Sequence, residues 1–275
     1  MAAPAYAKIN LGLLVGPRRP DGKHEIATVL ERVDLSDEIE LERVQEPGIS
    51  VEGFAGDTLV RRALELFGVR TSSRPSWRVE IEKRVPLASG LGGGSADAAT
   101  ALRLANELSD DRLSPEELHE LAAEIGSDVP FFLTSGAKLA TGDGTELDPV
   151  DLPCGYWVVL ALAHDARKES TAAVYASFDA AAGAAAFPEA KAALLDALGR
   201  ARAPRELANL PRNQLVAPDP RIGEPLAELG AFRVDTSGAG PTVYGLFERE
   251  DDARGAERSL RPNAKTWLAR PVPGP

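Results

Sequence analysis

A glycine-dense stretch constrains the fold of this chain more than any other segment. It reads PLASGLGGGSADAAT from Pro86 to Thr100. Before it, residues 77–85 alternate apolar and charged side chains, which predicts a strand. After it, the Ala- and Leu-rich segment from Ser95 to about Leu108 predicts a helix. The glycines permit positive φ and the close approach of a bulky anion, and a helix N-terminus attracts phosphate. We therefore expect this stretch to bind a nucleotide phosphate.

A tight strand-to-helix turn without any ligand is the alternative interpretation of the same glycines. Two common nucleotide-binding classes are excluded by the pattern. No lysine follows the glycines as in GxxxxGK[ST], and the order is not the GxGxxG that opens a dinucleotide-binding fold.

Composition sets broad limits on the partners. The 275 residues are 44% hydrophobic, enough for one large domain or two ordinary ones. A net charge of -11 argues against nucleic acid or an acidic membrane as the partner. The lone Cys154 excludes an internal disulfide, no apolar run reaches about 18 residues, and the first residues lack a secretory pattern. We expect a globular cytoplasmic protein that is a monomer or weak homodimer.

The N-terminal segment contains the next candidates for function. Residues 5–15 alternate apolar and mixed side chains, so we expect a strand with Lys8 and Asn10 on one side. A solvated strand face is the alternative. A turn-forming loop over residues 16–25 follows and contains Lys23 and His24. Because the chain has only three histidines, we assign His24 to a ligand, with a hydrogen bond inside the turn as the alternative.

Asp128 is the candidate acid–base group. It lies in GSDVPFF, residues 126–132, after a helix expected over residues 114–125 with Ser114 as its N-cap. Pro130 favours an extended Val129. An aspartate in such a turn is either structural or catalytic.

The remaining patterns predict both strands and helices, which indicates an α+β fold. We expect two or three strands in a meander over residues 26–45, broken at 35–37, and a short strand at 51–54. A helix over 58–67 has Asp57 as its N-cap, and a hairpin spans 138–150. The pattern changes near residue 152, which predicts domains at 1–152 and 153–275. In the second domain we expect a buried strand at 156–163, a helix starting at 168–171, a strand–turn–strand unit at 232–247, a helix at 251–260 and a strand at 266–268.

Three of these segments resemble the motifs of the GHMP kinases. They are AKINL from Ala7, PLASGLGGGSADAA from Pro86, and SGAGPTV from Ser237. In addition, DGKHE at 21–25 and GSDVPFF at 126–132 resemble signatures of the branch that phosphorylates a diphosphocytidyl sugar alcohol. The resemblance covers residues 5 to about 247. It implies a two-lobed α+β fold, with an N-terminal lobe like ribosomal protein S5 domain 2 and a C-terminal ferredoxin-like lobe.

The resemblance also implies an activity and roles for particular residues. The reaction would be ATP-dependent phosphorylation of the 2-hydroxyl of a methylerythritol moiety, on the non-mevalonate route to isoprenoid precursors. Asp128 would be the catalytic base, and Lys8 would stabilise charge on the phosphoryl group. Magnesium would arrive with ATP, and we assign no ligands to it. The implied ATP-binding residues are Thr58, Pro86, Leu87, Ala88, Ser89, Gly90, Leu91, Gly92, Gly93, Gly94, Ser95 and Ala96, and the implied substrate-binding residues are Asn10, Lys23, His24, Thr171, Gly238 and Ala239.

Departures from the family pattern keep two alternatives open. Lys23 stands where the family has an aromatic residue, Thr58 where asparagine is usual, and Ala96 where a second serine is common. One alternative is a GHMP kinase that acts on another small alcohol, such as mevalonate, phosphomevalonate or homoserine. The other is a catalytically silent nucleotide-binding relative. The DGKHE loop argues against the first, and Lys8 together with Asp128 argues against the second.

Overall fold

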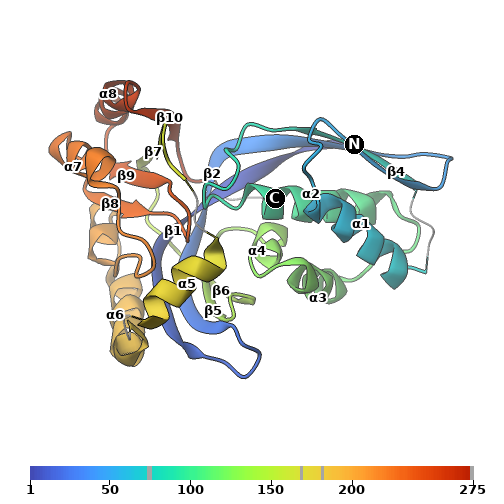
Figure 1. Cartoon of the computed structure of the whole chain (residues 1–275), viewed down its shortest axis with the longest axis horizontal. Coiled ribbons are helices and arrows are strands. Elements are labelled where there is room, and N and C mark those ends of the chain that lie inside the picture. Colours follow the sequence, from blue (N-terminus) through green and yellow to red (C-terminus); the bar gives the residue numbers. More distant parts are fainter. Residues whose placement is uncertain (73–75, 168–169, 181–182, 273–275) are drawn as a thin grey trace.

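Two antiparallel-rich sheets with covering helices form the two lobes of the molecule (Figure 1). The computed structural model describes residues 1–72, 76–167, 170–180 and 183–272. The first sheet has the order β3-β4-β2-β5-β6, with β1 beside β2, and the second has the order β10-β7-β9-β8. The strands are β1 Ala2–Arg18, β2 His24–Arg43, β3 Gly48–Glu52, β4 Ser76–Glu82, β5 Ala137–Gly142, β6 Glu146–Val150, β7 Trp157–Ala163, β8 Arg233–Thr236, β9 Val243–Phe247 and β10 Ala264–Ala269. The first sheet ends at Val150 and the second begins at Trp157, so the α+β, two-lobed prediction is confirmed.

The C-terminal lobe has the expected ferredoxin-like topology. Its units β7, α7 (Pro220–Glu228), β8, β9, α8 (Glu250–Leu260) and β10 follow the βαββαβ order of that fold. Helices α5 (Thr171–Ala180) and α6 (Phe187–Arg200) are inserted between β7 and α7, with short 3-10 turns at Gly183–Ala186 and Pro204–Asn209. Helices α7 and α8 contribute Leu226, Ala253 and Leu260 to a core shared with β7 and β9. In Figure 1, α5 (yellow) lies between the two lobes.

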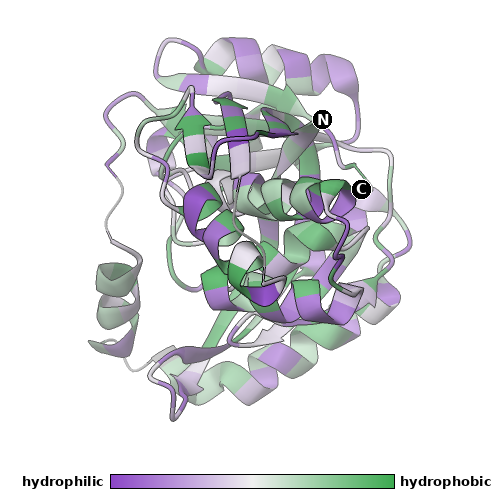
Figure 2. Ribbon diagram, turned by 90° about the vertical axis from the view of Figure 1, so that its right-hand side faces the viewer, coloured by the Kyte–Doolittle hydropathy of each residue, from purple (hydrophilic) through white to green (hydrophobic). Residues whose placement is uncertain are grey.

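The helices in the described part of the N-terminal lobe are α1 (Leu59–Arg70), α2 (Gly93–Leu108), α3 (Pro115–Ile125) and α4 (Val129–Leu133). Helix α2 is central because its small side chains Ala98, Ala99 and Ala105 are fully buried against neighbouring elements. Figure 2 shows hydrophobic and hydrophilic residues on different sides of the helices, as expected for helices with one buried face. Within the described part of the chain, no helix has the length and apolarity to cross a membrane.

The prediction of a meander over residues 26–45 is wrong, because this segment is one strand, β2, of 20 residues. Its pairing with β1 shifts where Tyr6 faces Ser36 but Ala7 faces Val33. Asp34 and Leu35 therefore form a bulge, which accommodates residues that otherwise indicate a turn. Along its other edge β2 pairs first with β5 and then with β4.

Most of the other expected elements are confirmed, with shifted ends. Helix α2 begins two residues before Ser95, and β3 ends before Phe54. The N-cap residue of α1 is Thr58, one position after the expected Asp57, but the side chain of Asp57 still accepts hydrogen bonds from the backbone N–H groups of Val60 and Arg61 in the first turn. The hairpin of β5 and β6, the strands β4 and β7, the β8–β9 unit, and helices α3 and α8 are all present. Helices α6 and α7 were not predicted.

Val129 is not extended but begins α4, because Pro130 occupies the first helical turn, where its missing N–H is not needed. Residues 168–169, at the expected start of the helix in the second domain, lie outside the described residues. The helix itself is present as α5.

Candidate active site

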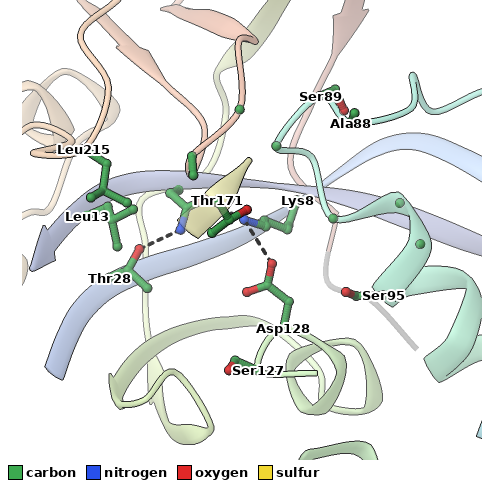
Figure 3. Close-up of a pocket in the computed structure, with 18 of the residues that line it drawn as sticks. Lys8, Leu13, Thr28, Ala88, Ser89, Ser95, Ser127, Asp128, Thr171 and Leu215 are labelled. Atoms are coloured by element: carbon green, nitrogen blue, oxygen red, sulfur yellow. Dashed lines mark hydrogen bonds and ion pairs between the residues drawn. The ribbon is translucent and has the colours of Figure 1, made fainter. Parts of the chain in front are cut away.

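A cavity of about 860 Å³ lies between the lobes and collects residues from β1, β2, the glycine stretch, α5 and the β8–β9 turn (Figure 3). Most of the residues expected at the site line it: Lys8, Asn10, Lys23, His24, Pro86, Leu87, Ala88, Ser89, Gly90, Gly92, Gly93, Gly94, Ser95, Asp128, Thr171, Gly238 and Ala239. Three do not. Leu91 and Ala96 are fully buried in the core, and Leu59 lines the cavity in place of Thr58.

Lys8 and Asp128 meet inside this cavity (Figure 3). Lys8 Nζ lies 3.4 Å from Asp128 Oδ2 and donates a hydrogen bond of 2.6 Å to Asn10 Oδ1. The amide of Asn10 in turn donates to Thr28 Oγ1 at 2.8 Å, and Thr28 donates to the carbonyl of Gly12 at 2.6 Å. Lys8 is only 3% exposed, whereas the side chain of Asp128 is 43% exposed. The ammonium group is therefore held rigidly, while the carboxylate stays open to the cavity.

A buried arginine holds the helix that carries Asp128. Asp128 is the N-cap residue of α4. Arg32 on β2 donates hydrogen bonds to the carbonyl of Phe131 inside that helix and to the carbonyl of Gly136 in the loop after it. The guanidinium carbon also lies 4.3 Å from the centre of the Phe131 ring, at cation–π distance. Burial lowers the pKa of Arg32 to about 10. No sequence pattern indicated a role for Arg32, because an arginine in a strand usually faces solvent.

The glycine stretch forms a backbone cradle at the start of α2. Gly92 caps the helix with φ of 72°, and the first helical residues Gly93, Gly94 and Ser95 line the cavity. The carbonyl of Leu91 accepts a hydrogen bond of 2.9 Å from the backbone of Lys8, which joins the cradle to β1. An open helix N-terminus lined by small residues is suited to phosphate.

The glycine turn between β8 and β9 packs directly on this cradle. Ser237 Oγ donates to the carbonyl of Gly90 at 3.0 Å, and the N–H of Thr242 donates to the carbonyl of Ser89 at 3.2 Å. A Cβ at Gly90 would lie 2.2 Å from the carbonyl oxygen of Ser237. Only glycine allows this contact between the lobes. The buried side-chain amide of Asn213 donates a hydrogen bond of 2.6 Å to the carbonyl of Gly238 and so supports the turn.

A charged cluster lies behind the cradle. Lys83 Nζ is 2.7 Å from Asp97 Oδ2 and also pairs with Asp37, which accepts from the N–H of Val85 at 2.8 Å. Burial and the neighbouring Asp37 raise the pKa of Asp97 to about 7, although the charge of Lys83 opposes this. The sequence signal was a lysine at an apolar-face position of the expected strand, and its meaning became clear only in the structure.

An aromatic and ionic group forms the far end of the cavity. The ring of His24 stacks on Tyr175 with centroids 4.9 Å apart, and His24 Nε2 lies 2.7 Å from Asp179 Oδ1. Hydrogen bonds with His24 and then Arg18 lower the pKa of Asp179. Burial raises the pKa of Tyr175 to about 12. Tyr175 and Asp179 were missed, yet they lie four and eight residues after Thr171, which places all three on one face of α5.

No group of three or more His, Cys, Asp or Glu side chains that could hold a metal ion occurs among the described residues.

Comparisons with known proteins place the chain among small-molecule kinases. The models for the GHMP kinases N terminal domain and GHMP kinases C terminal match residues 58–136 and 190–265. The chain is 36% identical over 276 residues to the 4-diphosphocytidyl-2-C-methyl-D-erythritol kinase of Geobacter sulfurreducens, covering 98% of this chain and 96% of the relative. It is 39% identical over 270 residues to the Pelotomaculum thermopropionicum protein of that name, covering 92% and 91%.

Solved structures agree with these relatives. A crystal structure of 4-(cytidine 5'-diphospho)-2C-methyl-D-erythritol kinase superposes with a TM-score of 0.79 at 32% identity and covers 100% of both chains. A crystal structure of mevalonate kinase has a TM-score of 0.76 at 13% identity, covering 98% of this chain and 99% of the other. At that identity the second likeness shows the shared fold alone.

Proposed function

Since the chain belongs to the 4-diphosphocytidyl-2-C-methyl-D-erythritol kinase family of the GHMP kinases, we propose that it transfers the γ-phosphoryl group of ATP to the 2-hydroxyl of 4-diphosphocytidyl-2-C-methyl-D-erythritol. This reaction belongs to the non-mevalonate route to isoprenoid precursors. The observation that carries the proposal is that Lys8 and Asp128 meet beside the glycine cradle in one cavity.

ATP would occupy the cradle side of the cavity. Its phosphates would lie on the backbone N–H groups at the start of α2, where the helix dipole favours negative charge. Leu87, which is 60% exposed at the cavity wall, offers apolar surface to the nucleotide. Mg²⁺ would arrive on the phosphates and keep several waters, with the Ser95 hydroxyl as an oxygen ligand nearby.

The chemistry would rest on Asp128 and Lys8. As the 2-oxygen of the alcohol bonds to the γ-phosphorus, the bond from phosphorus to the β,γ-bridging oxygen breaks and ADP leaves. Asp128 would take the proton of the hydroxyl, and the fixed Lys8 ammonium would balance the charge that develops on the transferred group. Positioning and electrostatics dominate such a transfer.

The alcohol would enter from the α5 side. Asn10, Thr171 and the Gly238–Ala239 turn border the space beside Asp128, and the stacked His24 and Tyr175 form an aromatic wall for the cytosine base. We also propose that residues 1–152 form the ATP-binding lobe and residues 153–275 the substrate lobe of a cytoplasmic monomer or weak homodimer.

Asp128→Asn tests the assignment of the base. The substitution keeps the size of the side chain but removes the proton acceptor, so we expect kcat to fall by about 10²- to 10⁴-fold with KM for ATP unchanged. Asp110→Asn is the matched control, because Asp110 is 98% exposed and lies outside the cavity lining. An Asp128→Asn enzyme as fast as its parent would show that Asp128 is not the base.

The substrate is tested by steady-state assays with the diphosphocytidyl alcohol, mevalonate and homoserine. We expect turnover of the diphosphocytidyl alcohol, as the names of the relatives suggest. Activity on mevalonate or homoserine alone would reject the proposed substrate while leaving the kinase fold and base intact.

A further inference from the structure

A buried ion pair lies on β8, the strand that leads into the glycine turn of the C-terminal lobe. Arg233 Nη2 is 2.7 Å from Asp235 Oδ2, and the two side chains are 1% and 0% exposed. Neither residue lines the cavity between the lobes. The pair therefore has no direct part in the phosphoryl transfer, yet its hydrogen bonds lead towards the cavity from two sides.

Asp235 holds the glycine turn through Asn213. Its carboxylate accepts hydrogen bonds from the backbone N–H groups of Asn213 at 3.1 Å and of Thr236 at 2.9 Å. The side-chain amide of Asn213 then donates to the carbonyls of Thr236 at 2.9 Å and of Gly238 at 2.6 Å. Because Asp235 fixes the backbone of Asn213, the amide reaches the chain on both sides of Ser237, and the turn is held from behind.

Arg233 extends the network in the other direction, to β1. Its Nε donates to the hydroxyl of Tyr244 at 3.3 Å, and this hydroxyl donates to the carbonyl of Asn10 at 2.9 Å. The guanidinium also donates to the carbonyl of Pro211 at 3.0 Å. A Cβ at Gly12 would lie 2.6 Å from the oxygen of that carbonyl, so the segment held by Arg233 packs directly against β1.

The two branches of the network meet where the alcohol would bind. A Cβ at Gly238 would lie 3.3 Å from Asn10 Oδ1 and 3.4 Å from Lys8 Nζ, and all three residues line the cavity. A buried ion pair is weak evidence for stability, because its desolvation offsets most of the Coulomb attraction. The hydrogen bonds of this pair instead fix the distance between two walls of the cavity.

We propose that the Arg233–Asp235 pair positions the acceptor alcohol without touching it. Asn213 transmits the constraint to the turn between β8 and β9, and Tyr244 transmits it to Asn10. The pair thereby sets the spacing of two walls of the alcohol site. This inference rests on the proposed function, because it names the residues that shape the site of the proposed alcohol.

The full-length double variant Arg233→Met/Asp235→Leu separates positioning from stability. It leaves neither charge of the pair buried without its partner, so we expect urea unfolding close to that of the parent. At saturating ATP, kcat/KM for the diphosphocytidyl alcohol should fall about 100-fold, with KM raised about 10-fold and kcat lowered about 10-fold. A smaller amount of folded enzyme would lower the apparent kcat but would leave KM unchanged, so the rise in KM distinguishes positioning from a merely structural role.

Glu257→Gln/Arg261→Met is the matched control. This ion pair of 3.0 Å lies on α8 of the same lobe, outside the cavity lining, and its removal should leave KM for the alcohol unchanged. Tyr244→Phe keeps the inference testable if the first double variant folds poorly, because it removes one hydroxyl and no charge. We expect it to raise KM for the alcohol about threefold, the effect of one lost hydrogen bond.

The inference would be overturned if KM for the alcohol stayed at the parental value in both the Arg233→Met/Asp235→Leu and the Tyr244→Phe enzymes. It would also be overturned if the control raised KM as much as the double variant does. Turnover of the diphosphocytidyl alcohol by the parent separates the two levels: if it occurs while KM is unchanged in the variants, the proposed function holds and only the positioning role is rejected.

Discussion

Gly90→Ala should disrupt the contact between the glycine stretch and the β8–β9 turn, although the substitution adds only one methyl group. Gly90 has φ of 86°, and its missing Cβ leaves room for the carbonyl oxygen of Ser237 and the backbone of Gly240. An added Cβ would lie 2.2 Å from that oxygen and 2.8 Å from the Cα of Gly240. Both neighbours are backbone atoms, so a side-chain rotation cannot relieve the overlap.

The expected loss of unfolding free energy has two parts, and a second variant separates them. A left-handed conformation costs an L-residue roughly 1–2 kcal/mol. Overpacking against backbone that has to move by about 1 Å adds roughly 1–3 kcal/mol. Gly230 has φ of 96° with nothing within 4 Å of a Cβ, so Gly230→Ala carries only the first part. We expect Gly90→Ala to lose about 2–5 kcal/mol of unfolding free energy and Gly230→Ala about 1–2 kcal/mol.

Urea unfolding of both variants measures this difference, with equal m-values confirming comparable transitions. The Gly90→Ala enzyme should also show a raised KM for ATP, because Ser89 and Gly90 belong to the nucleotide cradle. The reasoning would be refuted if Gly90→Ala were no less stable than Gly230→Ala and kept the parental KM for ATP.

Three further predictions follow from buried groups near the site. Because the pKa of Asp97 rises from 3.8 to about 7 on folding, the folded protein binds a proton that the unfolded chain has released, so stability falls as pH rises from about 4 to 7. Urea unfolding of Asp97→Asn should therefore show a smaller fall in unfolding free energy between about pH 4 and pH 7. If the fall were as large as in the parent, other groups would be its cause. Arg32→Lys should lower kcat about tenfold with KM for ATP unchanged, because lysine lacks the planar guanidinium group that donates to the carbonyls of Phe131 and Gly136. A variant with the parental kcat would show that α4 needs no such support. Tyr175→Leu should raise KM for the alcohol by removing the ring stacked on His24, and equal KM values would argue against an aromatic wall for the base.

The chemistry-bearing motifs and most of the secondary structure could be predicted from short stretches of the sequence. Alternation in residues 77–82 and the capping residues Ser114 and Asp57 act locally, within a few residues of the element that they define. The glycine stretch and SGAGPTV likewise need particular backbone conformations that few other residues adopt. For this reason both were recognisable without knowledge of the fold.

The contacts between distant segments, in contrast, depend on long-range packing that no short stretch of the sequence specifies. Residues 35–37 carry turn signals, yet pairing with β1 before and after them makes β2 continuous and converts the break into a bulge at Asp34 and Leu35. Lys23 donates a hydrogen bond to Asp143, which is 120 positions away, so no local pattern could pair them. Lys83 occupies an apolar-face position of the expected strand, but the sequence does not show its partners. In the structure it pairs with two carboxylates, one on β2 and one on α2. Local patterns specify which face of an element is apolar, whereas the register of strands and the partners of buried charges follow from long-range packing.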